Sequence, residues 1–600
     1  MAERLKRTQV QEQETWDLFD LFENTAAWEQ ELGAIRESFG TVVQYQGHLA
    51  ESADVVCECL DAREALAIRF TRVNTYASLK FSEDGSDPVN QTNSDRVAAL
   101  GGELNAATSF VDSELLDLPA GTIESYLDSY PGLAEHRNYL EQLAEYKPYR
   151  LSPDTEAALA ALGPVHAAPY SIYQRSKSSD MQFDAVVDDN GHEHTMSAAL
   201  YEDKFEQSSD TNLRRAAFRS FAKTLGQYQN TIAAAYGAEV KRQVTLSRLR
   251  GYSSVTDMLL QPQQVPADLY HNILDVIQRD LAPHMRRLAR LRQRVLGLDK
   301  MLHCDLKAPL DPAFQPQTTF EQASETILGA LSVLGDEYTD IIRKGLTSRW
   351  VDLADNIGKS TGAFCSSPYG VHPYILITWT DNMRSTFVLA HELGHAGHFS
   401  LAQMNQRYVN TRPSMTFVEA PSTMNEMLLG RYILDRSDDA KMRRWVIMQL
   451  LGTYYHNYVT HLLEGELQRR VYKLADAGTP MTATLLSDLK GSVLSEFWGD
   501  AVEIDDAAKL TWMRQPHYYM GLYPYTYSVG LTVSTLASQR IFSEGQPAVN
   551  DWLRVLKAGG TMKPLELMKA AGVDMSTPEP IERAVAYVGT LVDELEKSFI

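Results

Sequence analysis

The stretch LAHELGHAGH, residues 389–398, places three histidines and one glutamate within ten positions. His391 and His395 are four residues apart, which on a helix corresponds to about 40° of rotation and about 6 Å of rise, so both imidazoles project from one face. Glu392 follows the first histidine, where its carboxylate can reach a water on a metal without being a ligand itself. This H-E-x-x-H arrangement predicts a helix that carries two zinc ligands and a general base.

The same letters also fit a buried helix whose histidine and glutamate satisfy each other, and chance alone gives the pattern in roughly a few per cent of chains this long. Two glycines within the stretch bear on the question. Gly394 and Gly397 would be poor helix formers in an exposed helix, and they are better explained where another segment or a ligand approaches closely. We therefore expect close packing around this helix.

A catalytic zinc site needs a third protein ligand. His398 lies seven residues after His391, about 10 Å along the helix axis, which is too far for all three histidines to bind one ion at about 2 Å. His398 therefore stays only an alternative ligand or a residue that supports the ligands. The third ligand is expected on a second helix.

That second helix is predicted in TFVEAPSTMNEMLLGRYIL, residues 416–434, with Thr416 as its N-cap and Pro421 in its first turn. Glu419 and Glu426 are seven residues apart and hence share a face. One of them is expected to bind zinc while the other accepts a hydrogen bond from a ligating histidine. For Glu426, a solvated carboxylate is the competing interpretation.

A cluster of phenols follows near the C-terminus, in WMRQPHYYMGLYPYTYSVG, residues 512–530. Hydroxyl groups next to an imidazole can donate hydrogen bonds to an oxyanion, although tyrosines also pack well between helices. We expect one or two of the tyrosines, together with His517, to take part in the chemistry, and the others to pack or to line a substrate channel. The candidates are Tyr518, Tyr519, Tyr523, Tyr525 and Tyr527.

Most of the remaining chain has helical periodicity, as in residues 270–299, 320–338 and 445–476. Strand signals are few. Residues 181–196 alternate around Asn190-Gly191 and predict a hairpin. HPYILITW, residues 372–379, is a β-branched and aromatic run that can pair with a substrate backbone, which makes His372 and Tyr374 candidate substrate-binding residues. The pattern predicts a mostly helical protein with a boundary near residue 200.

The composition excludes several classes of function. The 600 residues carry a net charge of −22, which argues against a nucleic-acid partner. The sequence contains no run of about 18 apolar residues, so a membrane span is not expected. The N-terminal residues lack the apolar core of a signal peptide. Four cysteines are too few for a disulfide framework. We expect a cytoplasmic protein.

In these stretches the chain resembles the oligoendopeptidase F branch of the thimet-oligopeptidase zinc metallopeptidases. The resemblance also rests on LHCDLKAPL, GVHPYILITW and GDAVEIDDAAKLTW, which occur in the family's order and extend over roughly residues 200–580. It implies that His391, His395 and Glu419 bind one zinc ion per chain and that Glu392 is catalytic. His517 and Tyr527 stand where the family carries a histidine and tyrosines before its final helices.

The resemblance also implies a mostly helical ovoid with a deep substrate channel, zinc-bearing helices and a small β-sheet in the catalytic half. An N-terminal helical domain, residues 1–200, would precede a metallopeptidase domain, residues 201–600. We expect zinc-dependent hydrolysis of internal bonds in short peptides, with His517 and Tyr527 as oxyanion donors and Tyr523 and Tyr525 on the substrate side of the channel.

Two alternatives stay open. A carboxypeptidase or dipeptidyl-carboxypeptidase would need a cation for the substrate's C-terminal carboxylate, and Arg514 is the candidate. The other alternative is a catalytically inactive peptide-binding protein, although a glutamate kept between two metal ligands argues against it. The sequence leaves the oligomeric state open.

Overall fold

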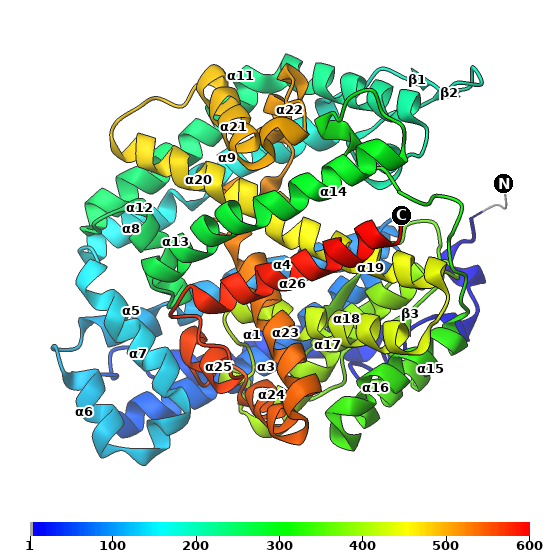
Figure 1. Cartoon of the computed structure of the whole chain (residues 1–600). Coiled ribbons are helices and arrows are strands. Elements are labelled where there is room, and N and C mark those ends of the chain that lie inside the picture. Colours follow the sequence, from blue (N-terminus) through cyan, green and yellow to red (C-terminus); the bar gives the residue numbers. More distant parts are fainter. Residues whose placement is uncertain (1–3, 600) are drawn as a thin grey trace. The chain divides into compact units, whose positions relative to one another are not determined.

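The computed structural model describes residues 4–599 and is mostly helical, as expected (Figure 1). The chain forms two compact units, each assembled from three separate segments. Unit 1 consists of Met1–Pro148, Pro316–Arg436 and Val533–Val573, and unit 2 consists of Tyr149–Gln315, Ser437–Thr532 and Asp574–Ile600. Residue 200, near which the sequence suggested a boundary, lies inside unit 2, and the division into residues 1–200 and 201–600 stays a prediction.

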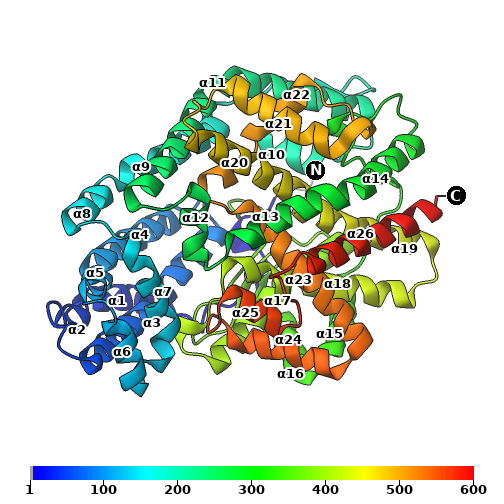
Figure 2. The ribbon, with the colours of Figure 1, turned by 60° about the vertical axis from the view of Figure 1, so that its left-hand side comes forward.

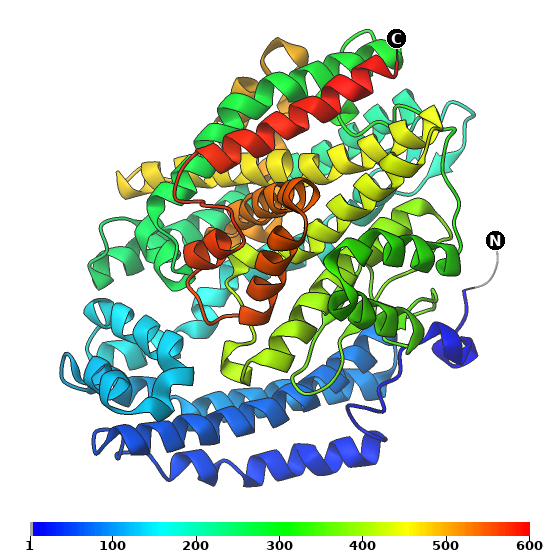
Figure 3. The same ribbon diagram turned by 60° about the horizontal axis from the view of Figure 1, so that its bottom comes forward.

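Unit 1 combines an N-terminal group of helices with the helices around LAHELGHAGH. In the first group α3 packs against α1 and α4, and Figure 3 shows these long helices lying side by side. The helices of unit 1 are α1 (Thr25–Glu37), α2 (Gly40–Val43), α3 (Ala53–Glu83), α4 (Pro88–Thr108), α5 (Phe110–Asp117), α6 (Thr122–Ser129), α7 (Arg137–Tyr146), α15 (Phe320–Leu331), α16 (Asp336–Thr347), α17 (Met383–Asn405), α18 (Met415–Arg436), α24 (Gln546–Ala558) and α25 (Pro564–Ala570).

A small sheet of three strands also belongs to unit 1. Its strands are β3 (Val351–Asp352), β4 (Phe364–Ser366) and β5 (Tyr374–Leu376). The order is β3-β5-β4, with β5 parallel to β3 and antiparallel to β4. The predicted strand at residues 372–379 is thus confirmed in a shorter form, and it is the middle strand.

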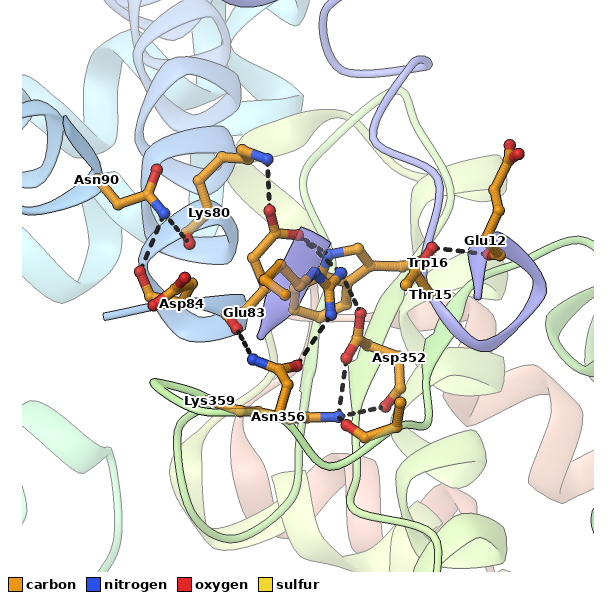
Figure 4. Close-up of polar contacts among 12 residues, drawn as sticks. Glu12, Thr15, Trp16, Lys80, Glu83, Asp84, Asn90, Asp352, Asn356 and Lys359 are labelled. Atoms are coloured by element: carbon orange, nitrogen blue, oxygen red, sulfur yellow. Dashed lines mark hydrogen bonds and ion pairs between the residues drawn. The ribbon is translucent and has the colours of Figure 1, made fainter. Parts of the chain in front are cut away.

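The N-terminal segment is fastened to this sheet by buried ion pairs (Figure 4). The fully buried carboxylate of Asp352 accepts a hydrogen bond from Arg7 at 2.6 Å and pairs with the ammonium of Lys359 at 2.7 Å. The indole of Trp16 donates to Glu83, near the end of α3, at 2.8 Å. Because an unpaired buried charge would be strongly destabilising, these contacts hold the segment, α3 and β3 together.

Helices α17 and α18 are in close contact along their length (Figure 1), and the two glycines explain why. A Cβ atom at Gly394 would lie 2.5 Å from the carbonyl oxygen of Pro421 and 2.6 Å from Cα of Ser422. A Cβ atom at Gly397 would lie 2.5 Å from the ring of Tyr338. The expectation of close packing around this helix is confirmed.

The start of α18 differs from the prediction. The helix begins at Met415, so Thr416 lies inside it and Pro421 lies beyond the first turn. The hydroxyl of Ser414 accepts a hydrogen bond from the backbone N–H of Thr416 at 3.4 Å. This is the N-capping contact that was expected from the side chain of Thr416. The prediction of Thr416 as the N-cap was wrong because the preceding serine supplies this bond.

Unit 2 is built around the 40-residue helix α11, which packs against α9, α20 and α21 (Figure 2). Its helices are α8 (Pro153–Ala161), α9 (Gly163–Arg175), α10 (Ala198–Leu200), α11 (Thr211–Arg250), α12 (Val255–Leu260), α13 (Ala267–Val276), α14 (Ala282–Val295), α19 (Ala440–Tyr454), α20 (His461–Asp476), α21 (Ala483–Trp498), α22 (Asp506–Lys509) and α26 (Glu579–Lys597). Helix α23 (Pro524–Glu544) contains the boundary between Thr532 and Val533.

The predicted hairpin is confirmed in unit 2, where β1 (Val186–Val187) pairs antiparallel with β2 (Glu193–His194). The helical stretches at 270–299 and 445–476 are also confirmed, each with one π-helical turn, at Ile277–Leu281 and Tyr455–Thr460. Across residues 4–599, no helix combines the length and the apolar character that crossing a membrane requires.

Candidate active site

Three predicted metal ligands converge in unit 1. His391 and His395 come from α17 and Glu419 comes from α18. Their candidate ligand atoms all lie within 4.8 Å of one another. Oε2 of Glu419 is 3.4 Å from Nε2 of His391 and 3.4 Å from Nε2 of His395.

These separations test whether a metal fits. Ligands at roughly 2.0–2.1 Å from a tetrahedral zinc ion are about 3.3–3.4 Å apart, whereas an N–H···O hydrogen bond is about 2.9–3.0 Å long. The observed 3.4 Å matches the edge of a metal tetrahedron better than a hydrogen bond. The donor set of two imidazoles and one carboxylate is also one that zinc accepts, so the residues fit the metal.

Two neighbouring side chains on α18 orient this set. Glu426 accepts a hydrogen bond from Nδ1 of His391 at 2.7 Å, which leaves Nε2 of that ring for a metal. The hydroxyl of Ser422 donates to Oε2 of Glu419 at 2.9 Å. Ser422 was not identified from the sequence, although its position three residues after Glu419 on a helix was a usable signal.

Glu392 is the remaining acidic group of the LAHELGHAGH stretch. Its side chain is 94% buried, since its relative exposure is 6%. Among the described residues it has no hydrogen-bond or ion-pair partner. Burial raises the pKa of Glu392, while the adjacent His391 and His395 act in the opposite direction. An unpaired carboxylate beside the ligand set is available to take up a proton.

His398 lies outside the ligand group. Its ring is fully buried, stacks on Phe399 with centroids 5.1 Å apart, and meets Phe417 edge-on at 6.0 Å. Within residues 4–599 neither ring nitrogen has a hydrogen-bond partner. Burial lowers the pKa of His398 to about 3, so the ring is neutral.

His517 belongs to unit 2, where it is part of a network around one carboxylate. Oε2 of Glu464 lies 3.0 Å from Nδ1 of His461 and 3.1 Å from Nδ1 of His517. Nε2 of His461 lies 3.1 Å from Nε2 of His456. His461, Glu464 and His517 are residue types that could hold a metal. However, the distances of 3.0 and 3.1 Å from Glu464 to the two rings are those of N–H···O hydrogen bonds.

Glu464 is therefore an acceptor for two imidazole N–H groups. Burial alone would raise its pKa, but His461 and His517 hold the pKa of Glu464 well below its ordinary value. Sequence reasoning missed Glu464 and His461. Their spacing, three residues apart on α20, offered a signal, whereas the 53 residues between Glu464 and His517 offered none.

The tyrosines divide into two groups. The hydroxyl of Tyr527 lies 3.3 Å from that of Tyr523, and the ring of Tyr527 stacks on His461 at 4.1 Å. Tyr518 and Tyr525 are buried, with 2% and 0% exposure. The Tyr525 hydroxyl donates to Gln263 at 2.7 Å, so its side chain is a packing residue rather than part of a channel wall.

The residues predicted on the strand at 372–379 are packed as well. Tyr374 is fully buried in the hydrophobic core of unit 1 and meets Trp16 edge-on. His372 stacks on Trp350 at 4.9 Å, and its Nδ1 lies 2.7 Å from the carbonyl oxygen of Pro373. Because β5 has β3 on one side and β4 on the other, a substrate backbone cannot add to it. The expectation of pairing with this strand, and of Tyr374 as a contact, is corrected.

Arg514, the predicted cation for a carboxypeptidase, already has partners in unit 2. Its guanidinium donates to both carboxylate oxygens of Glu206 at 2.7 Å and to Glu202 at 3.2 Å. Burial would raise the pKa of Glu206, but Arg514 and Lys307 lower it to about 2. A guanidinium engaged in this way is not free to bind a substrate carboxylate.

One further group of possible ligands lies in unit 1, formed by Asp61, Glu64 and His136. The guanidinium of Arg407 pairs with Asp61 at 2.6 Å and also with Glu64. The ring of His136 donates to Oδ1 of Asp61 at 3.0 Å. Since an arginine already neutralises these carboxylates, this cluster is an ion-pair network and no metal is needed to explain it.

Comparisons with known proteins identify the family of the chain. Residues 204–587 match the family model described as Peptidase family M3, and residues 114–183 match the model described as Oligopeptidase F. Oligopeptidase PepF of Bacillus subtilis (strain 168) is 32% identical over 591 residues, which cover 98% of this chain and 88% of that protein. Group B oligopeptidase PepB of Streptococcus agalactiae serotype III (strain NEM316) is 27% identical and covers 98% of both chains.

Solved structures give the same result. The chain matches a peptidase structure from Chlamydophila abortus with a TM-score of 0.90 at 26% identity, covering 99% of this chain and 100% of that one. It matches oligoendopeptidase-F from Enterococcus faecium with a TM-score of 0.74 at 26% identity, covering 95% of this chain and 98% of that one.

Proposed function

The chain belongs to peptidase family M3, and on this premise we propose that it is a zinc-dependent endopeptidase that hydrolyses internal bonds of short oligopeptides. The observation that carries the proposal is the set of His391, His395 and Glu419, with ligand atoms 3.4 Å apart and an unpaired Glu392 beside them. The relatives named oligopeptidase or oligoendopeptidase support peptides as the substrate class.

One zinc ion per chain would be held by His391, His395 and Glu419. When bound, zinc supplies a Lewis acid that polarises the scissile carbonyl and makes water more acidic. The hydrogen bond from His391 to Glu426 keeps the Nδ1 proton on that ring and aims Nε2 at the metal. The hydroxyl of Ser422 keeps the Glu419 carboxylate in place.

Glu392 is the proposed general base and acid. It accepts the proton that the attacking water loses and returns it to the amine of the leaving peptide. Two properties suit it to this role. The carboxylate has no other partner among the described residues, and burial raises its pKa above the ordinary value of a glutamate, which makes it a stronger base.

His517 and Tyr527 are the proposed donors to the oxyanion of the tetrahedral intermediate. Glu464 accepts the Nδ1 proton of His517, which leaves Nε2 as the nitrogen for a ligand. A donating Nε2 must carry a proton in addition to the one on Nδ1. The Tyr527 hydroxyl lies 3.3 Å from the hydroxyl of Tyr523.

An internally quenched peptide with both ends blocked tests the proposal. We expect cleavage at an internal bond, identified by mass spectrometry, about one zinc per chain by metal analysis, and loss of cleavage with a chelator. No cleavage of this peptide, together with release of residues from the same peptide with a free C-terminus, would instead indicate a carboxypeptidase. Peptide binding without any turnover by the zinc-loaded protein would indicate an inactive binding protein. Either result would refute the proposed activity.

A further inference from the structure

Unit 2 contains a pocket whose wall includes Glu464, the partner of His517. It encloses about 540 Å³ of space, counted with its open mouth. The wall contains both polar and apolar side chains. Its lining includes Glu206, His303, Glu464, Lys490, Arg514 and Gln515. These residues come from two segments of unit 2, Tyr149–Gln315 and Ser437–Thr532.

The two carboxylates in the wall are already neutralised or engaged. Glu206 accepts hydrogen bonds from Arg514 at 2.7 Å and from Lys307 at 2.9 Å. Glu464 accepts from His461 and His517. Neither carboxylate makes an ion pair with a further lysine. The wall thus offers no free anion.

Lys490, on α21, is the cation without a partner. Its exposure is 6%, and among residues 4–599 it makes no hydrogen bond and no ion pair. Burial lowers the pKa of Lys490 to about 8, while Glu464 acts to raise it. At pH 7 the ammonium is therefore mostly charged. A buried charge without a counter-ion is unfavourable, so the pocket favours an anion.

Two neutral donors complete the wall. The ring of His303 makes no hydrogen bond within the described part of the chain, and burial together with the charge of Lys490 lowers its pKa to about 3. It is therefore a neutral imidazole with one N–H to give. The side-chain amide of Gln515 also has no hydrogen-bond partner in that part of the chain and can donate through its NH₂ group.

We propose that this pocket is a binding site for a carboxylate, with Lys490 as its counter-ion and Gln515 and His303 as hydrogen-bond donors. One unpaired ammonium balances one negative charge, which suits a monoanion better than a phosphate dianion. A carboxylate has two oxygens and can accept from all three donors. Arg514 does not contribute because Glu206 occupies both arms of its guanidinium.

The carboxylate has two possible sources, a free small acid or the C-terminus of a peptide. The second source rests on the proposed peptidase function and deepens it, whereas the first does not depend on it. Both sources present a carboxylate to the pocket. Binding of a carboxylate is therefore tested first, with a probe that the protein does not have to cleave.

The probe is trifluoroacetate, followed by ¹⁹F NMR as it is titrated into the zinc-loaded protein. We expect a saturable change in the fluorine signal that acetate reverses. Lys490→Met should weaken binding at least tenfold, because it removes the charge and keeps the chain length. The matched control is Lys223→Met on α11, whose side chain is 62% exposed and pairs with Asp184 at the surface, and this variant should bind like the wild type.

Several results would overturn the proposal. They are the absence of saturable binding to the wild type, unchanged binding to a folded Lys490→Met, and displacement by chloride as effective as displacement by acetate. Circular dichroism shows whether Lys490→Met is folded. If it is not, Gln515→Ala takes its place, because this side chain has no bond to lose. Loss of one hydrogen bond to a charged group should weaken trifluoroacetate binding about tenfold, and unchanged binding would equally overturn the assignment.

The two sources are then separated with one peptide in two forms. The Glu392→Gln variant, in which the peptide is not turned over, is loaded with trifluoroacetate and titrated with the peptide acid or its C-terminal amide. Displacement by the acid alone assigns the pocket to a peptide C-terminus. Displacement by acetate and by neither peptide assigns it to a free small acid. Failure of the peptidase proposal would leave the acetate result unchanged, so the two hypotheses fail separately.

Discussion

Replacing Gly394 by alanine tests whether α17 and α18 must touch for the metal ligands to converge. The added Cβ atom would lie 2.5 Å from the carbonyl oxygen of Pro421 and 2.6 Å from Cα of Ser422. Ordinary contacts between non-bonded heavy atoms are about 3.5–4.0 Å long. Both neighbours belong to the backbone and cannot rotate away, so α18 has to move by about 1 Å.

The expected magnitude follows from two opposing effects. Alanine is the better helix former by about 1 kcal/mol, whereas overpacking a tight contact is destabilising by roughly 1–3 kcal/mol and occasionally more. With a rigid backbone as the obstacle we expect a net loss of about 1–2 kcal/mol, or a few degrees in the melting temperature. Ligand distances tolerate only about ±0.2 Å. A movement of α18 should therefore displace Glu419 and weaken zinc binding by at least an order of magnitude.

The assay combines thermal unfolding with zinc titration against a fluorescent chelator. The control is Gly102→Ala in the interior of α4, where no atom lies within 4 Å of the added Cβ. This control should stabilise unit 1 by up to about 1 kcal/mol and leave zinc affinity unchanged. The reasoning is refuted if Gly394→Ala melts no lower than the wild type and binds zinc equally well.

Four further predictions concern single side chains. Glu392→Gln should retain zinc but lower kcat by several orders of magnitude, and near-normal turnover would remove it as the general base. Glu426→Gln should weaken zinc affinity about 10–100-fold, while Asp435→Asn, exposed on the same helix, should not; equal effects would exclude a specific role. Tyr527→Phe should lower kcat about 10²–10³-fold with a smaller change in KM, and unaltered kcat would leave Tyr527 a packing residue. Glu206 has its pKa lowered to about 2, below roughly 4.3 in the unfolded chain, so its stabilisation is present at neutral pH and is lost as the pH falls from about 5 to 2; acid titration of Glu206→Gln should lack this loss, and an unchanged titration would contradict the assignment.

The part of the site that could be predicted from the sequence depends on local geometry. His391, Glu392 and His395 lie on a single helix, and a spacing of four residues fixes their relative directions once that helix forms. Gly394 was informative for the same reason, because a glycine inside a helix needs an explanation from its surroundings, and the backbone of α18 provides it. The error at Thr416 was also local, and it moved the start of α18 by only two residues.

The features that could not be predicted depend on partners far away in the chain. Arg514 was a plausible carboxylate ligand until its partner Glu206, 308 residues earlier, was known. The strand at residues 372–379 was recognised correctly, but a strand signal does not tell whether both edges are occupied, and β5 has a partner on each side. Periodicity reports which residues form an element and not which elements become its neighbours.

The location of the proposed residues allows their effects on zinc binding to be separated from their effects on peptide turnover. All three proposed ligands and Glu426 lie in unit 1, whereas His517, Glu464 and Tyr527 lie in unit 2. Residues of unit 2 supply no ligand to the proposed metal, so changes there should leave zinc affinity unaltered while they lower kcat. Changes at Glu419 or Gly394 should lower both, because the metal must be bound before any substrate is cleaved. Measuring zinc affinity and kcat on the same variants therefore assigns each residue to one step, without any assumption about how the two units are arranged.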